Sequence, residues 1–130
     1  MSAPVGIVLV SHSAELAKGL GSLVQQIGSD DVPLATAGGT DDGRIGTSYH
    51  LVLAAIRHAD RGGGVVVLPD LGSSVLTARA VLEDNPRSDI TIVDAPFVEG
   101  AVAAVVTAAS GADLQTVANA AKEARHVLKL

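Results

Sequence analysis

A histidine between two serines is the first residue in the chain whose surroundings suggest chemistry. His12 directly follows an apolar run and is flanked by Ser11 and Ser13. A neutral imidazole is a competent nucleophile near pH 7. The N–H groups and the dipole of a helix beginning here would favour an anion beside it, such as a phosphoryl group. The alternative is that the segment only caps the helix, but serine and asparagine are commoner caps than histidine.

Asp70 is the residue best placed to assist His12. It ends a second apolar run, 65–68 with Pro69, and the strand formed by that run is expected beside the strand that precedes His12. A carboxylate bonded to one ring nitrogen fixes the tautomer and leaves the other nitrogen free to attack. Asp70 could also cap the next helix together with Ser73, and the two roles are compatible.

The other polar groups carry weaker signals. The glycine-rich segment 38–46 lacks the Gly-Lys-Ser/Thr ending of a phosphate-binding P-loop, although its glycines allow close backbone approach. His50 and His58 are eight residues apart, which is too far for a metal-binding pair. Asp94 and Glu99 could form an acid–base pair, but helix-start roles are the simpler interpretation. No metal site is expected.

Apolar runs and helical spacings alternate along the chain, and this alternation predicts the elements that position these residues. Strands are expected at 5–10, 34–37, 65–68 and 90–93, with helices at about 16–27, 52–59, 75–82, 98–109 and 114–128. Gly28 is the expected stop of the first helix, and Asp113 is a candidate cap for the last one. The first helix is predicted from five aliphatic residues at helical spacing: Leu16, Leu20, Leu23, Val24 and Ile27. The pattern predicts a three-layer, doubly wound α/β fold with a mainly parallel sheet. A flavodoxin-like order with the first strand central is the expected topology. Ligands bind at the carboxyl ends of such strands, so the four following loops should meet at one edge.

Length and composition narrow the classes of function. The 130 residues fit one domain, 1–130, and the net charge of −5 argues against nucleic-acid binding. One Phe, one Tyr and no Trp leave little aromatic surface for stacking a base or a flavin. The absence of cysteine excludes disulfides and cysteine–zinc sites. No signal peptide or run of membrane-spanning length is evident, so we expect a cytoplasmic protein without membrane contact.

Four segments together resemble one known family. They are Val10-Ser11-His12-Ser13, the stretch from Ala37 to Ser48 (AGGTDDGRIGTS), the stretch from Asp70 to Val75 (DLGSSV) and the stretch from Asp94 to Ala101 (DAPFVEGA). In this order they are similar to the phosphotransferase subunits, DhaM type, of the phosphoenolpyruvate-dependent dihydroxyacetone kinases. The first and third segments also resemble mannose-type IIA domains of sugar phosphotransferase systems.

The resemblance implies a function and a set of partners. It implies a homodimer with the mannose-type IIA fold, without a cofactor, in which His12 receives a phosphoryl group from enzyme I by way of HPr. His12 would pass the group to ADP on a separate nucleotide-binding kinase subunit, which then phosphorylates dihydroxyacetone. Asp70 would hydrogen-bond the active imidazole. The remaining phosphoryl-binding donors of the family correspond to Ser13, Gly39, Thr40, Gly72 and Ser73.

Some family members carry fused HPr-like and enzyme I-like domains, which this sequence lacks, so the donor is expected to be a separate protein. Three alternatives remain open from the sequence. The first is the IIA component of a mannose-type sugar transporter, against which the 41–48 segment argues. The second is a class II tetrapyrrole metal chelatase, which would need a second metal ligand facing His12. The third is a flavodoxin-like or receiver-type signalling module.

Overall fold

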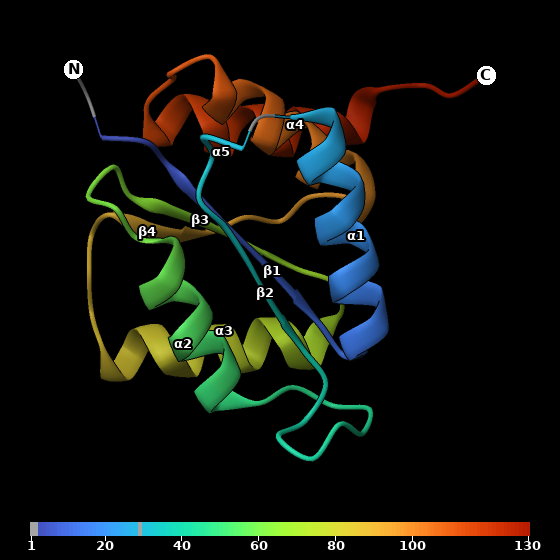
Figure 1. Ribbon diagram of the computed structural model, residues 1–130, viewed down its shortest axis with the longest axis vertical. Helices are drawn as coiled ribbons and strands as arrows, with labels where there is room; N and C mark the ends of the chain where they lie inside the picture. Colours follow the sequence, from blue (N-terminus) through green and yellow to red (C-terminus); the bar gives the residue numbers. More distant parts are fainter. Residues whose placement is uncertain (1–2, 29) are drawn as a thin grey trace.

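The structure, a computed structural model, describes residues 3–28 and 30–130. Strands and helices alternate through most of the chain (Figure 1). The elements are β1 (Gly6–Ser11), α1 (Ala14–Ile27), β2 (Leu34–Gly38), α2 (Tyr49–Ala59), β3 (Val65–Pro69), α3 (Gly72–Asp84), β4 (Ile90–Ile92), α4 (Phe97–Ala109), α5 (Leu114–Glu123) and the 3₁₀ turn η1 (Ala124–His126).

The four strands form a parallel sheet in the order β2-β1-β3-β4. In the register, Val8 of β1 lies between Ala35 of β2 and Val67 of β3. This arrangement confirms the predicted α/β class and the interior position of the first strand. Because all strands run the same way, the residues that follow β1 and β3 emerge side by side.

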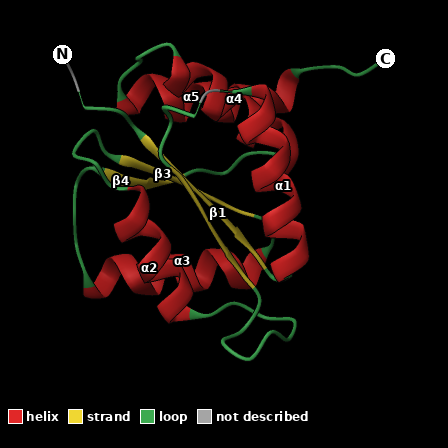
Figure 2. Cartoon of the chain, viewed as in Figure 1, coloured by secondary structure: helices red, strands yellow, loops and turns green. Residues whose placement is uncertain are grey.

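Helices cover both faces of the sheet, which Figure 2 shows as a diagonal band of strands between two groups of helices. One core packs α1, α4 and α5 against one face, and a second core packs α2 and α3 against the other. Every residue of β1 and β3 is buried, as expected for continuous apolar strands in a parallel sheet covered on both faces. No helix within 3–28 and 30–130 is long and apolar enough to cross a lipid bilayer.

The ends of α1 and α5 carry the local signals that the sequence predicted. Ser13 caps α1 and Asp113 caps α5, and Gly28 ends α1, which confirms the predicted stop and the Asp113 cap. Of the five aliphatic residues used to predict α1, only Leu20 and Val24 are buried. The other three are about half exposed, because the face that meets the sheet is narrower than the apolar stripe: Leu16, Leu23 and Ile27.

The last helix is shorter than the expected 114–128. α5 ends at Glu123 and is followed by η1, after which residues 127–130 form no regular structure. Leu128 and Leu130 are almost fully exposed there. The apolar pattern predicted more helix because it could not show that the chain leaves the surface against which α5 packs.

A glycine sets the distance between β2 and the start of α1. A Cβ atom on Gly38 would lie 2.6 Å from the carbonyl oxygen of Ser13 and 2.7 Å from the Cα of Ala14. Both contacts are with backbone atoms, which cannot swing aside as a flexible side chain would. Gly38 therefore lets the end of β2 meet the first residues of α1, where the candidate site lies.

Candidate functional site

His12 and Asp70 meet at the carboxyl edge of the sheet because β1 and β3 are neighbours. Val10 pairs with Pro69, and the N–H of Asp70 donates to the carbonyl of Val10 at 2.9 Å. His12 Nδ1 then lies 2.9 Å from Asp70 Oδ1. The Asp70 side chain is 8% exposed and the His12 side chain 21% exposed, so the carboxylate is enclosed while part of the ring reaches solvent.

The Asp70 carboxylate accepts hydrogen bonds on both oxygens. Oδ2 accepts from Ser11 Oγ at 2.8 Å and from the backbone N–H of His12 at 3.1 Å. Oδ1 accepts from Ser74 Oγ at 2.8 Å and from the backbone N–H of Leu71 at 2.7 Å, in addition to its contact with the imidazole. Because the carboxylate accepts so many hydrogen bonds, its position is fixed and its ionised form is favoured.

These contacts determine the charge of Asp70. Burial alone would raise the pKa of Asp70, but the hydrogen bonds from Ser11, His12 and Ser74 outweigh it and lower the pKa from 3.8 to about 2. Asp70 is therefore ionised at neutral pH and can only accept hydrogen bonds. This assigns the proton of the neutral imidazole to Nδ1, so Nε2 carries the lone pair.

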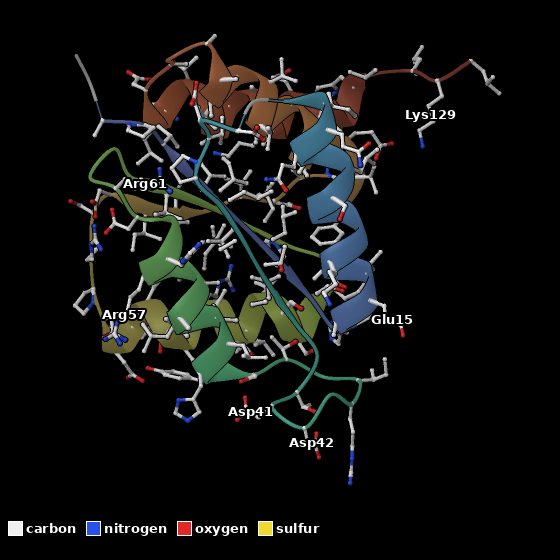
Figure 3. All side chains as sticks on the ribbon, in the orientation of Figure 1. Glu15, Asp41, Asp42, Arg57, Arg61 and Lys129 are labelled. Carbon is white, nitrogen blue, oxygen red and sulfur yellow. The ribbon has the colours of Figure 1, made fainter. Side chains whose placement is uncertain are left out.

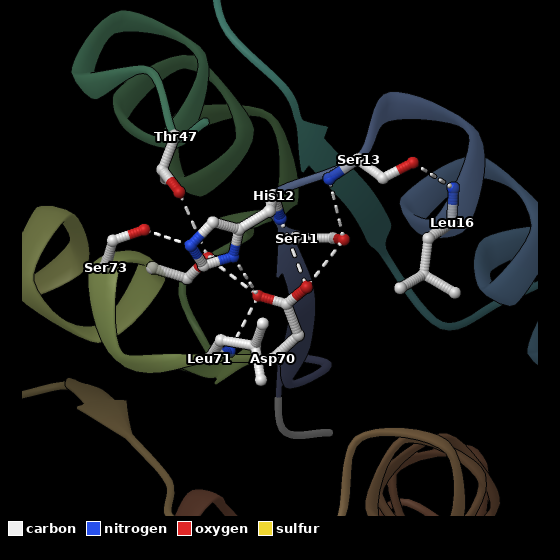
Figure 4. A network of polar contacts seen from close by, with 9 residues as sticks. Ser11, His12, Ser13, Leu16, Thr47, Asp70, Leu71 and Ser73 are labelled. Atoms are coloured by element: carbon white, nitrogen blue, oxygen red, sulfur yellow. Dashed lines mark hydrogen bonds and ion pairs between the residues drawn. The ribbon is translucent and has the colours of Figure 1, made fainter. Parts of the chain in front are cut away.

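Nε2 points toward the start of α3 (Figure 4). The Ser73 hydroxyl hydrogen-bonds Nε2, and with the lone pair on that nitrogen Ser73 is the donor. Helix α3 begins at Gly72, and its N-cap residue, Leu71, makes no side-chain cap bond. The first N–H groups of a helix have no carbonyl partner within it, and the helix dipole favours negative charge there. Ser73 thus adjoins Nε2 in the first turn of α3, and the phosphoryl-binding role of Ser73 and Gly72 stays a prediction.

Ser13 lies on the other side of the ring, where its hydroxyl caps helix α1. Its backbone N–H donates to Ser11 Oγ at 3.0 Å, and its hydroxyl accepts from the N–H of Leu16 at 3.2 Å. It caps α1, as the simpler interpretation of this segment predicted. Capping does not exclude a phosphoryl-binding role, which stays a prediction.

Gly39 and Thr40 lie in the loop between β2 and α2, which also carries the exposed Asp41 and Asp42 labelled in Figure 3. The donors of Gly39 and Thr40 are directed to partners other than the His12 ring. The Gly39 N–H donates to the carbonyl of Ser11 at 3.1 Å, and Gly39 has a φ of +74°, which glycine tolerates best. The Thr40 N–H donates to the Arg44 carbonyl at 2.9 Å, and its hydroxyl donates to Asp42. Within the described part of the chain, no hydrogen bond joins Gly39 or Thr40 to the His12 ring, and their phosphoryl-binding role stays a prediction.

The network also contains Ser74 and Thr47, which were not among the predicted site residues. Ser74 is fully buried and contacts Asp70, and Thr47 contacts Ser74 from the β2–α2 loop. Both lie inside segments that carried the family resemblance, but 27 residues separate them. A single sequence gives no sign that they pair, although the two adjacent serines after Asp70 could have drawn attention to Ser74.

The described residues offer little support for a metal centre. They contain no group of three or more histidine, aspartate or glutamate side chains that could hold a metal ion. The acidic partner of His12 is Asp70, whose oxygens are already occupied by donors. A chelatase would need a second ligand facing His12, so the site suits group transfer on a histidine better than metal insertion.

Comparison with known proteins identifies the family of this chain. The family model described as EIIA-man, PTS system fructose IIA component, matches residues 6–118. The phosphoryl donor subunit DhaM of dihydroxyacetone kinase 1 from Listeria innocua is 40% identical over 103 residues, covering 79% of this chain and 81% of that protein. This chain belongs to the EIIA-man family, among the DhaM-type subunits.

Other members of the family differ in length. The Escherichia coli DhaM subunit is 40% identical over 119 residues, which cover 87% of this chain but only 25% of the E. coli protein. The DhaM subunit of dihydroxyacetone kinase 2 from L. innocua is 35% identical over 123 residues, which cover 92% of this chain and 92% of that protein. A crystal structure of a protein of unknown function, EF1359, superposes with a TM-score of 0.81 at 32% identity and covers 95% of each chain.

Proposed function

We propose that the chain is a phosphohistidine carrier of a phosphoenolpyruvate-dependent dihydroxyacetone kinase. His12 Nε2 accepts a phosphoryl group from the HPr phosphocarrier and delivers it to ADP bound on the nucleotide-binding kinase subunit. One observation carries the proposal: His12 is held through Nδ1 by an ionised Asp70, while Nε2 faces Ser73 at the start of a helix. That combination gives a nucleophile with an anion-stabilising environment directly beside it.

The transfer needs positioning and charge stabilisation from this chain. The Nε2 lone pair attacks phosphorus, a new N–P bond forms, and the bond to the donor's histidine nitrogen breaks, with its electron pair returning to that nitrogen. The His12 ring keeps its Nδ1 proton and becomes cationic, and Asp70 Oδ1, 2.9 Å away, offsets that charge. The Ser73 hydroxyl is placed to turn from Nε2 to a phosphoryl oxygen. Transfer to a terminal oxygen of ADP reverses these steps and yields ATP.

The relatives support this choice over a sugar-transport IIA component. The names of the E. coli and L. innocua proteins specify phosphoryl donor subunits of dihydroxyacetone kinases. A homodimer, a cytoplasmic location and a single domain spanning 1–130 belong to the proposal as well. The cytoplasmic location is proposed because ADP and phosphoenolpyruvate are cytoplasmic metabolites. The proposed homodimer is tested by sedimentation velocity, which measures the oligomeric state directly.

The test is phosphoryl uptake followed by intact mass. The chain is incubated with phosphoenolpyruvate, enzyme I and HPr, in parallel with His12→Ala and with His58→Ala as the matched histidine control. We expect one acid-labile phosphoryl group on the wild type and on His58→Ala, and none on His12→Ala. Equal labelling of His12→Ala, or no labelling of the wild type by an active cognate HPr, would refute the carrier role.

A second arm identifies the acceptor. The phosphorylated chain is mixed with the ADP-binding kinase subunit, the dihydroxyacetone-binding subunit and dihydroxyacetone, and dihydroxyacetone phosphate is measured. Transfer to the membrane components of a mannose-type transporter, with none to dihydroxyacetone, would replace the kinase assignment by the sugar-transport alternative.

A further inference from the structure

The Thr47 hydroxyl reaches the His12 network from the far end of the β2–α2 loop. Thr47 Oγ1 lies 3.1 Å from Ser74 Oγ, and Ser74 is fully buried. Ser74 Oγ in turn lies 2.8 Å from Asp70 Oδ1 and 3.3 Å from His12 Nδ1. The phosphoryl-transfer steps described above use Asp70 and His12 but assign no task to Thr47.

Counting protons gives the direction of each hydrogen bond. A serine hydroxyl has one proton and can accept through its lone pairs. The ionised Asp70 accepts only, so the single Ser74 proton goes to Asp70 Oδ1. Ser74 must then accept from Thr47, and the chain of donors runs from Thr47 to Ser74 to Asp70.

Without the Thr47 proton, Ser74 Oγ would keep an unused acceptor position 3.3 Å from His12 Nδ1. With no donor holding its lone pair, the Ser74 hydroxyl is freer to turn from Asp70 and donate to Nδ1, which favours the tautomer with the proton on Nε2. That change makes Nε2 a poorer nucleophile, because its lone pair is less consistently available.

The backbone around Thr47 holds it against this site. Thr47 forms a parallel bridge with Gly39, and the N–H of the preceding Gly46 donates to the His12 carbonyl at 3.0 Å. The next residue, Ser48, is buried and caps α2 by accepting from the N–H of Leu51 at 3.1 Å. Thr47 is thus fixed between the His12 backbone and a helix cap, which keeps its hydroxyl within reach of Ser74.

We propose that Thr47 is a positioning residue that, through Ser74 and Asp70, keeps the proton of neutral His12 on Nδ1. The kinetic consequence rests on the proposed function, because a faster or slower uptake has meaning only if His12 takes up a phosphoryl group. The effect on the tautomer does not depend on any partner protein.

The test compares Thr47→Val, which removes the hydroxyl at nearly constant shape, with Thr47→Ser, which keeps it. Thr91→Val on β4 is the matched control, since the hydrogen bonds described for the His12 network do not include Thr91. The fraction of each neutral His12 tautomer is measured by ¹⁵N NMR of the imidazole, and the rate of phosphoryl uptake from HPr is measured separately. Thermal unfolding confirms that each variant is folded, with Thr47→Ala as a second hydroxyl-free variant.

We expect Thr47→Val and Thr47→Ala to lower the fraction of the Nδ1–H tautomer and to slow uptake about fivefold, the effect of losing one neutral hydrogen bond. Thr47→Ser and Thr91→Val should match the wild type in both measurements. A wild-type tautomer fraction or uptake rate in Thr47→Val, or a Thr47→Ser variant that behaves like Thr47→Val, would overturn the proposal. If the wild type takes up no phosphoryl group, the proposed function fails, and the NMR comparison still decides the role of Thr47.

Discussion

Replacing Asp70 by asparagine tests the site through both stability and chemistry. The carboxylate accepts on both oxygens, whereas the Asn amide can accept on only one side and presents N–H groups on the other. Whichever way the amide turns, it directs N–H groups at donors, either Ser11 and the His12 N–H or the imidazole, Ser74 and the Leu71 N–H. We expect Asp70→Asn to be less stable than the wild type and to position His12 poorly.

The size of the stability effect follows from the pKa of Asp70. Each pKa unit corresponds to ~1.4 kcal/mol at 25 °C. The folded protein lowers the pKa of the 8%-exposed Asp70 side chain from 3.8 to about 2. Ionisation of Asp70 thus contributes about 2 kcal/mol at pH 7. Because the folded-state pKa is the lower one, this stability is fully present above about pH 4 and is lost as the pH falls toward about 2.

Urea unfolding of the wild type and Asp70→Asn, followed by circular dichroism from pH 7 to pH 2.5, measures this difference. Asp30→Asn, at an exposed position away from the site, is the control and should match the wild type throughout. The gap between wild type and Asp70→Asn should be about 2 kcal/mol at pH 7 and should narrow below pH 4. A gap of zero at pH 7, or one that does not change with pH, would refute the account of the carboxylate. Phosphoryl uptake by Asp70→Asn should fall on the order of 100-fold because the imidazole is no longer held in position.

Two further substitutions, with Gly19→Ala as a control, separate the proposed phosphoryl-binding end of the site from its scaffold. Ser73→Ala should slow phosphoryl uptake by about tenfold, the cost of one hydrogen bond to a charged group, while urea unfolding remains unchanged; a wild-type rate would remove Ser73 from the site. Gly38→Ala should lower the free energy of unfolding by about 1–3 kcal/mol because its Cβ would press on the backbone of Ser13 and Ala14. Gly19→Ala, in α1 with nothing within 4 Å of the added carbon, should instead raise it by about 0.5–1 kcal/mol. The same unfolding experiment compares the two glycines, and equal effects would contradict the packing argument for Gly38.

Much of the fold was predictable because it depends on local patterns. Continuous apolar runs such as that of β3 are typical of strands buried on both faces, and the alternation with helices requires parallel pairing. The predicted end of α1 at Gly28 and the cap at Asp113 were confirmed because turn and cap chemistry is local. The end of α5 was predicted wrongly because the apolar residues near the C-terminus, Val127, Leu128 and Leu130, remain largely exposed instead of packing as a helix face.

The sequence by itself determined which groups meet at the sheet edge. Parallel strands end on the same side, so the sequence places His12 after the first strand and Asp70 after the third at one edge of the sheet. The observed pairing of β1 with β3 then makes the two residues neighbours. The residue types then favoured a histidine held by a carboxylate, with helix capping by Asp70 as a compatible second role. These inferences need only periodicity, topology and the chemistry of two side chains.

Only the tertiary structure decided how the protons and donors are arranged. The pairing of Thr47 with Ser74 joins residues on different elements, and the use of the Gly39 N–H by Ser11 depends on how the loop folds back. The position of the imidazole proton, on which our proposal that Nε2 is the nucleophile rests, likewise follows from distances around Asp70. Hydrogen bonds require atoms within a few tenths of an ångström of their ideal separation. Such precision comes from the packing of several elements at once, which a linear pattern of residue types does not specify.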